Sequence, residues 1–260
     1  MAGLLEGKCG LITGGGSGMG RAMALKFTEQ GAKVLICGRT VSKLEETAEL
    51  VHAQGGVCEY VQCDVTKEEE VKAMVDKTVE LFGKLDFAVN GASIETVGQK
   101  IWEREADTFK EIIENDLYSV FYCMKYETGY MVKQGYGSIV NMSSGAGAVG
   151  VGDMEPYACA KAAVNNLTQS SAIGVGPHGV RVNAILPGMT LTPMIKQFKS
   201  HYPEFAKTME SQIPLGRMAE PEEQADAALF LCSDMSTDIT GVLLKVDGGY
   251  QAGYYTKKED

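Results

Sequence analysis

Long apolar runs are missing from this 260-residue chain. No uninterrupted apolar segment reaches the roughly 18 to 20 residues that a membrane-spanning helix needs. The first eight residues, MAGLLEGK, also lack the charged region and long apolar core of a secretory signal. We therefore expect a cytoplasmic protein with no membrane partner.

Positive charge is in short supply. The chain has 24 Lys and Arg against 34 Asp and Glu, which gives a net charge of −10. Nucleic acids and anionic membrane surfaces bind basic faces, so neither is expected as a partner. The simplest interpretation of the negative charge is that it favours solubility.

Metal-binding and disulfide patterns are absent as well. The seven cysteines are an odd set without a C-x-x-C pair, and most lie in apolar stretches where a reduced thiol behaves as a small hydrophobe. The three histidines are not grouped with cysteine or carboxylate residues, so we expect no metal site and a reducing compartment. No linker, low-complexity block or repeat divides the chain, which predicts one domain over residues 1–260.

What the sequence does contain is a regular alternation of strand and helix patterns. Apolar strand patterns occur at residues 9–12, 33–37, 57–63, 85–89, 138–142, 181–186 and 242–246. Helical patterns separate them, including a long one from about 106 to 132. Continuous apolar strands between helices predict a parallel sheet covered on both faces, which is a doubly wound α/β fold.

A glycine cluster follows the first strand. The segment Thr13–Gly20 leads from this strand into a helix, an arrangement that presents free backbone N–H groups and a positive helix end to an anion. Gly14 would allow the sharp turn, Gly18 the close approach of phosphates, and Gly20 the packing of helix on strand. An isolated glycine-rich turn can be a plain loop, but in this context it predicts a dinucleotide site.

The end of the second strand indicates which dinucleotide. In the usual fingerprint, a carboxylate at this place binds the adenosine ribose and selects NAD, whereas this chain has Gly38-Arg39-Thr40. A guanidinium can pair with a 2′-phosphate, so the sequence favours NADP(H) over NAD(H). Asp64, after the third strand, could reach the adenine edge or could simply open a turn.

A second constellation joins a phenol, an ammonium and a hydroxyl. Tyr157 and Lys161 are four residues apart at the start of a helical pattern, so both side chains lie on one face. Upstream, Ser143 and Ser144 end a strand, and the carboxyl ends of strands face the ligand crevice of a doubly wound sheet. Spacing alone leaves open which serine supplies the hydroxyl.

From about Leu5 to Gly249 the chain resembles the short-chain dehydrogenase/reductase family. The resemblance rests on Thr13–Gly20, Asp64, a motif at Asn90, Asn115, Ser144, Tyr157, Lys161, Pro187-Gly188 and Asp247-Gly248-Gly249, all in order. It implies an oxidoreductase with a single-domain Rossmann fold, a doubly wound seven-stranded parallel sheet, assembled as a homotetramer through its long helices.

The same resemblance implies site residues by position. The catalytic set would be Asn115, Ser144, Tyr157 and Lys161, which selects Ser144 over Ser143. The cofactor would contact Gly14, Ser17, Gly18, Met19, Gly20, Gly38, Arg39, Thr40, Asp64, Val65, Asn90, Ala92, Tyr157, Lys161, Pro187, Gly188, Thr190 and Thr192.

The chain departs from the family pattern after the fourth strand. The family commonly has Asn-Asn-Ala-Gly there, and this chain has Asn90-Gly91-Ala92-Ser93. Gly91 cannot make the side-chain bonds of the second asparagine, which puts the rigidity of the loop under the cofactor in doubt. Thr190 also stands where an aliphatic residue is more usual.

The chemistry implied is hydride transfer between the cofactor and a carbonyl carbon, with Tyr157 exchanging the proton. A free phenol is a poor acid or base near neutrality, and the Lys161 ammonium would stabilise its ionised form. Ser144 would hold the substrate oxygen, and Asn115 would bind a water that relays the proton from Lys161.

The substrate is the least specified feature. Residues 192–217 are amphipathic and could form a lid over an apolar ligand or an ordinary packed excursion, with 145–155 as the opposite wall and an aromatic tail at 250–255. These features favour a bulky secondary alcohol or ketone, and within the family the chain looks most like bacterial hydroxysteroid and bile acid dehydrogenases. The alternatives are a 3-oxoacyl-carrier-protein reductase and a catalytically inactive nicotinamide-binding regulator.

Overall fold

Seven parallel strands form the central sheet of the structure, a computed structural model that describes residues 3–94, 98–253 and 255. The strands are β1 (Cys9–Thr13), β2 (Lys33–Gly38), β3 (Val57–Gln62), β4 (Phe87–Asn90), β5 (Gly137–Met142), β6 (Val180–Pro187) and β7 (Leu243–Val246). Their order is β3-β2-β1-β4-β5-β6-β7. The predicted strands and the doubly wound α/β fold are confirmed, and the order reverses between β1 and β4, where such sheets bind ligands.

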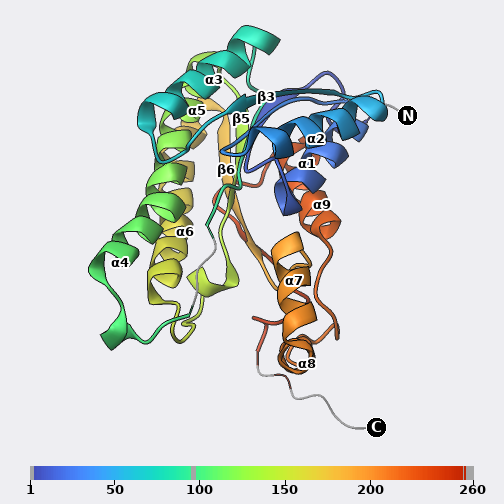
Figure 1. Cartoon of the computed structure of the whole chain (residues 1–260). Helices are drawn as coiled ribbons and strands as arrows, with labels where there is room; N and C mark the ends of the chain where they lie inside the picture. The colour runs from blue at the N-terminus through green and yellow to red at the C-terminus, as the bar shows by residue number, and fades with distance from the viewer. Residues whose placement is uncertain (1–2, 95–97, 254, 256–260) are drawn as a thin grey trace.

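Helices cover both faces of this sheet (Figure 1). One face packs against α1 (Gly18–Glu29), α2 (Val41–Ala53) and α9 (Pro221–Cys232), and the other against α3 (Glu68–Phe82), α5 (Ser119–Gln134) and α6 (Glu155–Val175). Two helices, α7 (Pro193–His201) and α8 (Pro203–Ser211), extend beyond the end of β6 (Figure 1).

The two layers give the molecule two apolar cores. Successive residues of a strand point to opposite faces, so Ile12 and Ile36 join the core under α1 and α9, while Leu11 and Leu35 join the core under α3 and α5. All residues of β1 and β4 are buried, as expected for central strands covered on both sides. This burial holds the carboxyl ends of the central strands in fixed positions.

The long helix predicted at residues 106–132 is present, but it contains a widened turn. It runs through α4 (Ala106–Ile113), a π-helical turn η2 (Glu114–Tyr118) and α5 without interruption. A π turn inserts one extra residue per turn and so changes which side chains face inward. This change matters for the site described below.

The described part of the chain has no helix that is both long and apolar enough to cross a membrane. Within the same residues, no three His, Cys, Asp or Glu side chains are grouped as a metal ion would require. All seven cysteines are free thiols, and all except Cys159 are buried. Burial raises the pKa of the Cys58 and Cys232 thiols to about 12, so these thiols act as apolar core groups.

Candidate active site

The turns that carry the predicted motifs meet at the carboxyl edge of the sheet. Strand register pairs Thr13 with Asn90 and Asn90 with Asn141, so the segments that follow β1, β4 and β5 leave the sheet side by side. These segments hold the glycine turn, the Asn90–Ser93 loop and the two serines, respectively. The parallel fold therefore brings together residues that are more than 100 positions apart.

The glycine turn has the shape that its sequence predicts. Gly14 and Gly18 adopt positive φ angles of 73° and 53°, which side chains with a Cβ rarely adopt. A Cβ on Gly20 would lie 2.2 Å from the carbonyl oxygen of Gly14, so only glycine lets α1 pack this close to the turn. Ser17 precedes α1 without capping it by its side chain, and Met19 is the second residue of the helix. The turn fits a pyrophosphate at the N-terminus of α1.

Residues of the second and third strand ends lie where an adenosine would bind. Arg39 and Thr40 are exposed and Gly38 is partly exposed. Asp64 accepts hydrogen bonds from the Thr66 N–H at 3.1 Å and from its hydroxyl at 2.8 Å. Burial acts to raise the pKa of Asp64, but these two bonds and the charge of Arg39 outweigh it and hold the pKa below its usual value. Asp64 therefore does open a turn, and this turn fixes a carboxylate beside Arg39.

Tyr157 and Lys161 share one face of α6, as their spacing predicts. The Lys161 Nζ lies 5.4 Å from the centre of the Tyr157 ring. It also donates a hydrogen bond of 3.2 Å to the carbonyl oxygen of Met142, the last residue of β5. Tyr157 is partly exposed whereas Lys161 is buried, so solvent or a ligand can reach the tyrosine while the ammonium stays inside the protein.

The structure distinguishes the two serines. Ser143 is buried, and its hydroxyl donates to the carbonyl oxygen of Lys161 at 3.1 Å, which ties β5 to α6. Ser144 is partly exposed, and its hydroxyl oxygen accepts a bond from the Ala146 N–H at 3.2 Å. The placement is consistent with a structural role for Ser143 and leaves Ser144 as the more accessible of the two hydroxyls.

Asn115 lies in the π turn of the long helix, and its role as a water-binding residue stays a prediction. Its amide donates to the carbonyl oxygen of Glu111 at 2.9 Å, one turn earlier in the same helix. The next residue, Asp116, is fully buried, and its Oδ1 lies 3.1 Å from the Lys161 Nζ. The π turn directs Asp116 inward and leaves Asn115 partly exposed at the side.

Asp116 was not predicted as a site residue, because the catalytic set was assigned from the order of the family motifs along the chain and not from the expected burial of each side chain. Ile112, Asp116 and Val120 are spaced four residues apart on one helical stripe, and all three are buried. A carboxylate on an apolar stripe needs a buried partner. The spacing of Asp116 relative to Ile112 and Val120 was the signal in the sequence that could have identified it.

The loop after β4 is held by its own contacts. The Asn90 side chain is buried and donates to Glu127 and Asn141, both at 3.0 Å. The backbone N–H groups of Gly91 and Ala92 donate to the Thr13 hydroxyl at 2.9 and 3.1 Å. The side chain of Asn90 is therefore committed to the core, so only its backbone is available to a ligand, and Thr13 supplies rigidity despite Gly91.

The segment after β6 returns to the glycine turn. Thr190 is buried with its hydroxyl bonded to the Gly188 carbonyl oxygen at 3.1 Å, so its side chain faces the protein. Thr192 precedes α7, and its methyl carbon lies 3.2 Å from where a Cβ on Gly18 would be. Thr192 therefore lies at the crevice between the turn and α7, near Pro187 and Gly188 at the end of β6.

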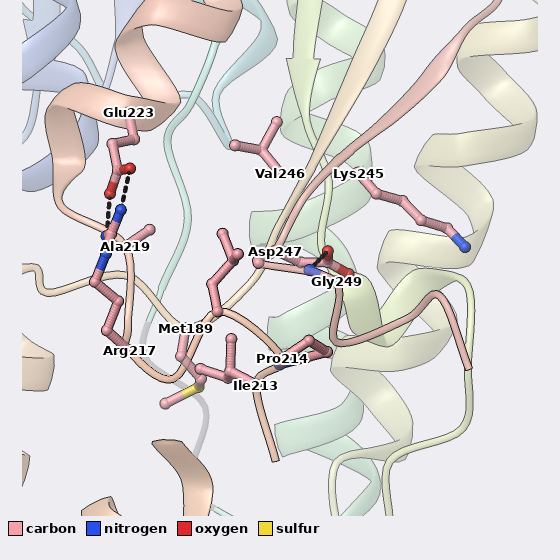
Figure 2. Close-up of a pocket in the computed structure, with 12 residues that line it drawn as sticks. Met189, Ile213, Pro214, Arg217, Ala219, Glu223, Lys245, Val246, Asp247 and Gly249 are labelled. Atoms are coloured by element: carbon pink, nitrogen blue, oxygen red, sulfur yellow. Dashed lines mark hydrogen bonds and ion pairs between the residues drawn. The ribbon is translucent and has the colours of Figure 1, made fainter. Parts of the chain in front are cut away.

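A cavity of about 420 Å³ lies beside the end of β7 (Figure 2). Its lining residues come from three segments and include Met189, Ile213, Pro214, Arg217, Val246 and Gly248. At its margin, Arg217 and Glu223 form two bonds of 2.6 and 2.7 Å, and this guanidinium lowers the pKa of Glu223 to about 2. Neither Ser144 nor Tyr157 lines this cavity, so it is separate from the residues around Lys161.

The fold and this arrangement together define an α/β oxidoreductase of the Rossmann type. A family model described as enoyl-(acyl carrier protein) reductase matches residues 14–251. A 2,5-dichloro-2,5-cyclohexadiene-1,4-diol dehydrogenase of Sphingobium indicum is 40% identical over 250 residues, which cover 95% of this chain and 98% of that protein. The cis-4-hydroxycyclohexanecarboxylate dehydrogenase of Sinomonas cyclohexanicum is 38% identical over 242 residues, covering 93% and 96%.

The crystal structure of levodione reductase superimposes with a TM-score of 0.90 at 33% identity, covering 96% of this chain and all of that one. The chain belongs to the short-chain dehydrogenase/reductase family, whose members are oxidoreductases that use a nicotinamide cofactor. The expected family is thereby confirmed, while the hydroxysteroid subtype has no support among these relatives.

Proposed function

We propose that this protein interconverts a secondary alcohol and a ketone on an apolar ring, with NADP(H) as the redox partner. The observation that supports it most is the pair on α6, with the Lys161 ammonium buried and the Tyr157 ring beside it, 5.4 Å from Nζ. A phenol next to a fixed cation is suited to exchanging a proton with a substrate oxygen.

The residues divide the reaction between them. When bound, a nicotinamide supplies or accepts the hydride. Tyr157 gives a proton to the carbonyl oxygen in reduction and removes it from the hydroxyl in oxidation, and Lys161 stabilises the phenolate between these events. Ser144 donates a hydrogen bond to the substrate oxygen where negative charge develops.

The cofactor preference follows from charge. Arg39 is exposed at the end of β2 and no carboxylate side chain precedes it at Gly38, so a 2′-phosphate would meet a guanidinium rather than an acid. Asp64 lies close enough for Arg39 to affect its ionisation, and it would face the adenine. The glycine turn, Val65, Ala92 and Thr192 would complete the contacts along the cofactor.

A cyclic substrate is supported by the relatives and by the site. Two relatives carry names of dehydrogenases for six-membered ring alcohols. In this chain, the α7–α8 excursion exposes large apolar side chains, among them Met194, Tyr202 and Phe205. Small rings and the larger fused rings of hydroxysteroids are both members of the substrate class that such a surface would accept.

A substrate panel tests the proposal. Purified protein is given NADPH or NADH with cyclohexanone derivatives, steroid ketones and 3-oxoacyl thioesters, and cofactor oxidation is followed by absorbance. We expect turnover with the ring ketones and a higher kcat/KM with NADPH. Activity confined to acyl thioesters would indicate a 3-oxoacyl-carrier-protein reductase, and no activity above background with any ketone would favour a nicotinamide-binding regulator.

Removing the hydroxyl group of Tyr157 tests the role of this residue. Tyr157→Phe removes the hydroxyl and keeps the ring, so cofactor binding measured by fluorescence titration should be unchanged. Turnover should fall by at least about a thousandfold, because the reaction loses its proton donor as well as a stabilising contact. Retained turnover in this variant would contradict the assignment.

A further inference from the structure

A buried carboxylate lies against the buried ammonium of the candidate site. The Asp116 Oδ1 is 3.1 Å from the Lys161 Nζ, and the two side chains are 0% and 2% exposed. In the described structure, the other groups recorded at Nζ are the Met142 carbonyl oxygen at 3.2 Å and the Tyr157 ring at 5.4 Å. Asp116 is thus the carboxyl group that lies against Lys161, from the helix packed against α6.

Asp116 is itself held in place from a third segment. The Ser93 hydroxyl, in the loop after β4, donates a hydrogen bond to the same Oδ1. The π turn η2 places Asp116 inward, in line with Ile112 and Val120 on the buried stripe of the helix. A hydrogen bond from Ser93 and an ion pair with Lys161 therefore meet at Asp116 and link the loop after β4, η2 and α6.

The charge of this pair bears directly on Tyr157. An ammonium alone would stabilise a neighbouring phenolate with its full field, whereas a carboxylate 3.1 Å from the ammonium offsets part of that field. A buried ion pair also fixes geometry, because separating its members leaves a charge uncompensated inside the protein. The position of the Lys161 ammonium and the strength of its effect on Tyr157 both depend on Asp116.

We propose that Asp116 is a positioning residue for the reaction: it anchors Lys161 beneath Tyr157 and sets how strongly Lys161 favours the phenolate, while Ser93 fixes its carboxylate. This inference rests on the proposed function, since it concerns the same proton transfer. In this role the two residues depend on each other: Asp116 positions Lys161, and Ser93 holds the carboxylate of Asp116 in place.

Two variants separate charge from anchoring. Asp116→Asn keeps an acceptor oxygen of the same shape but removes the negative charge. Asp116→Ala removes both. The matched control is Glu114→Gln, which makes the same charge change at an exposed residue of the same turn. Circular dichroism and thermal unfolding of each variant check that the fold is retained.

The first readout does not depend on activity. With carbon-13-labelled lysine, the NMR signal of Lys161, assigned by its loss in Lys161→Met, is titrated with pH in the wild type and in each variant. In Asp116→Asn the titration midpoint of this signal should fall by more than about one pH unit, because the carboxylate no longer favours the charged form. In Glu114→Gln it should stay within about 0.2 unit, since an exposed charge is screened by water.

The second readout is the pH dependence of kcat/KM for alcohol oxidation, which requires the phenolate. In Asp116→Asn the midpoint of the acid limb should move to lower pH by about one unit, the order expected for one charge within about 10 Å. Asp116→Ala should lose at least about ten times more kcat than Asp116→Asn, because it also releases the ammonium.

The outcomes are distinguishable. An unchanged Lys161 titration in Asp116→Asn would overturn the ion pair, and an acid limb that stays in place or moves upward would overturn its effect on Tyr157. Equal kcat in the Asn and Ala variants would overturn the anchoring role. If the wild type oxidised no alcohol, the proposed function would fail, and the NMR titration would still decide whether the pair exists.

Discussion

At the scale of single residues, the lack of a Cβ atom at Gly20 determines the shape of the candidate cofactor site. The turn between β1 and α1 is tight because a backbone carbonyl oxygen, that of Gly14, lies where a Cβ of residue 20 would be. This oxygen cannot move aside as a flexible side chain could. The glycine spacing of the sequence motif is thus a packing requirement of the helix as well as a phosphate-binding device.

We predict that Gly20→Ala weakens cofactor binding at least tenfold and destabilises the fold by about 1–3 kcal/mol, because α1 must shift away from the turn. Fluorescence titration with NADPH and thermal unfolding measure the two effects. The control is Gly129→Ala in α5, where a Cβ would meet nothing within 4 Å. That variant should bind NADPH normally and gain roughly 0.5–1 kcal/mol in helix stability. Wild-type NADPH affinity in Gly20→Ala would contradict the prediction.

At the scale of elements, the helix formed by α4, η2 and α5 carries two buried acids on its inner stripe. One is Asp116, and the other is Glu127, which accepts a hydrogen bond of 3.0 Å from Asn90. Burial raises the pKa of Glu127 to about 7, although the bond from Asn90 acts to lower it. The same helix therefore supports Lys161 at its π turn and the loop after β4 further along.

The raised pKa of Glu127 makes stability depend on pH. The Glu127 carboxyl binds a proton more easily in the folded than in the unfolded chain. Its stabilising contribution to the free energy of unfolding is therefore complete below about pH 4 and is lost as the pH rises to about 7. We predict that Glu127→Gln, neutral at every pH, becomes more stable relative to the wild type by about 3 kcal/mol between pH 5 and pH 8.

Urea unfolding at the two pH values measures this change. The control is Glu80→Gln, at an exposed residue of α3 that pairs with Lys77, where the difference from the wild type should stay nearly constant. A stability difference for Glu127→Gln that did not grow with pH would show that Glu127 is ionised in the folded protein.

At the scale of the whole molecule, the outer surface of η2, α5 and α6 exposes large apolar side chains. Tyr118 is 48% exposed, Phe121 44% and Ile173 80%. Tyr122 packs against Tyr118 and Phe121 with ring centres 6.1 and 5.7 Å apart, so the aromatic groups form one patch. From this patch on the long helices we propose that copies of this chain assemble into a homotetramer, as the family resemblance implies.

A charge placed in this patch tests the assembly. Phe121→Glu should convert the tetramer to a smaller species in sedimentation velocity, because association would bury an unpaired carboxylate. Met235→Glu is the control, since Met235 is 63% exposed but follows α9 on the other layer of the molecule. If Phe121→Glu sediments as the wild type does, this face is not the interface.

Sequence patterns predicted the elements more securely than the contacts between them. The strands at 33–37 and 138–142 were predicted because continuous apolar residues bounded by polar ones identify a strand covered on both faces. The pairing of Tyr157 with Lys161 followed from helical spacing. The contact between Asp116 and Lys161 was not predicted, because it joins side chains of two different helices.

The residues of this chain by themselves determined the doubly wound sheet and the glycine turn, since both depend on local periodicity and on backbone angles available to glycine. The tertiary structure alone decided that Asp116 lies against Lys161, that Ser143 is tied to the core while Ser144 is partly exposed, and that the Asn90 side chain is buried. These contacts join segments distant in sequence, and their partners are set by strand register and helix rotation rather than by neighbours along the chain.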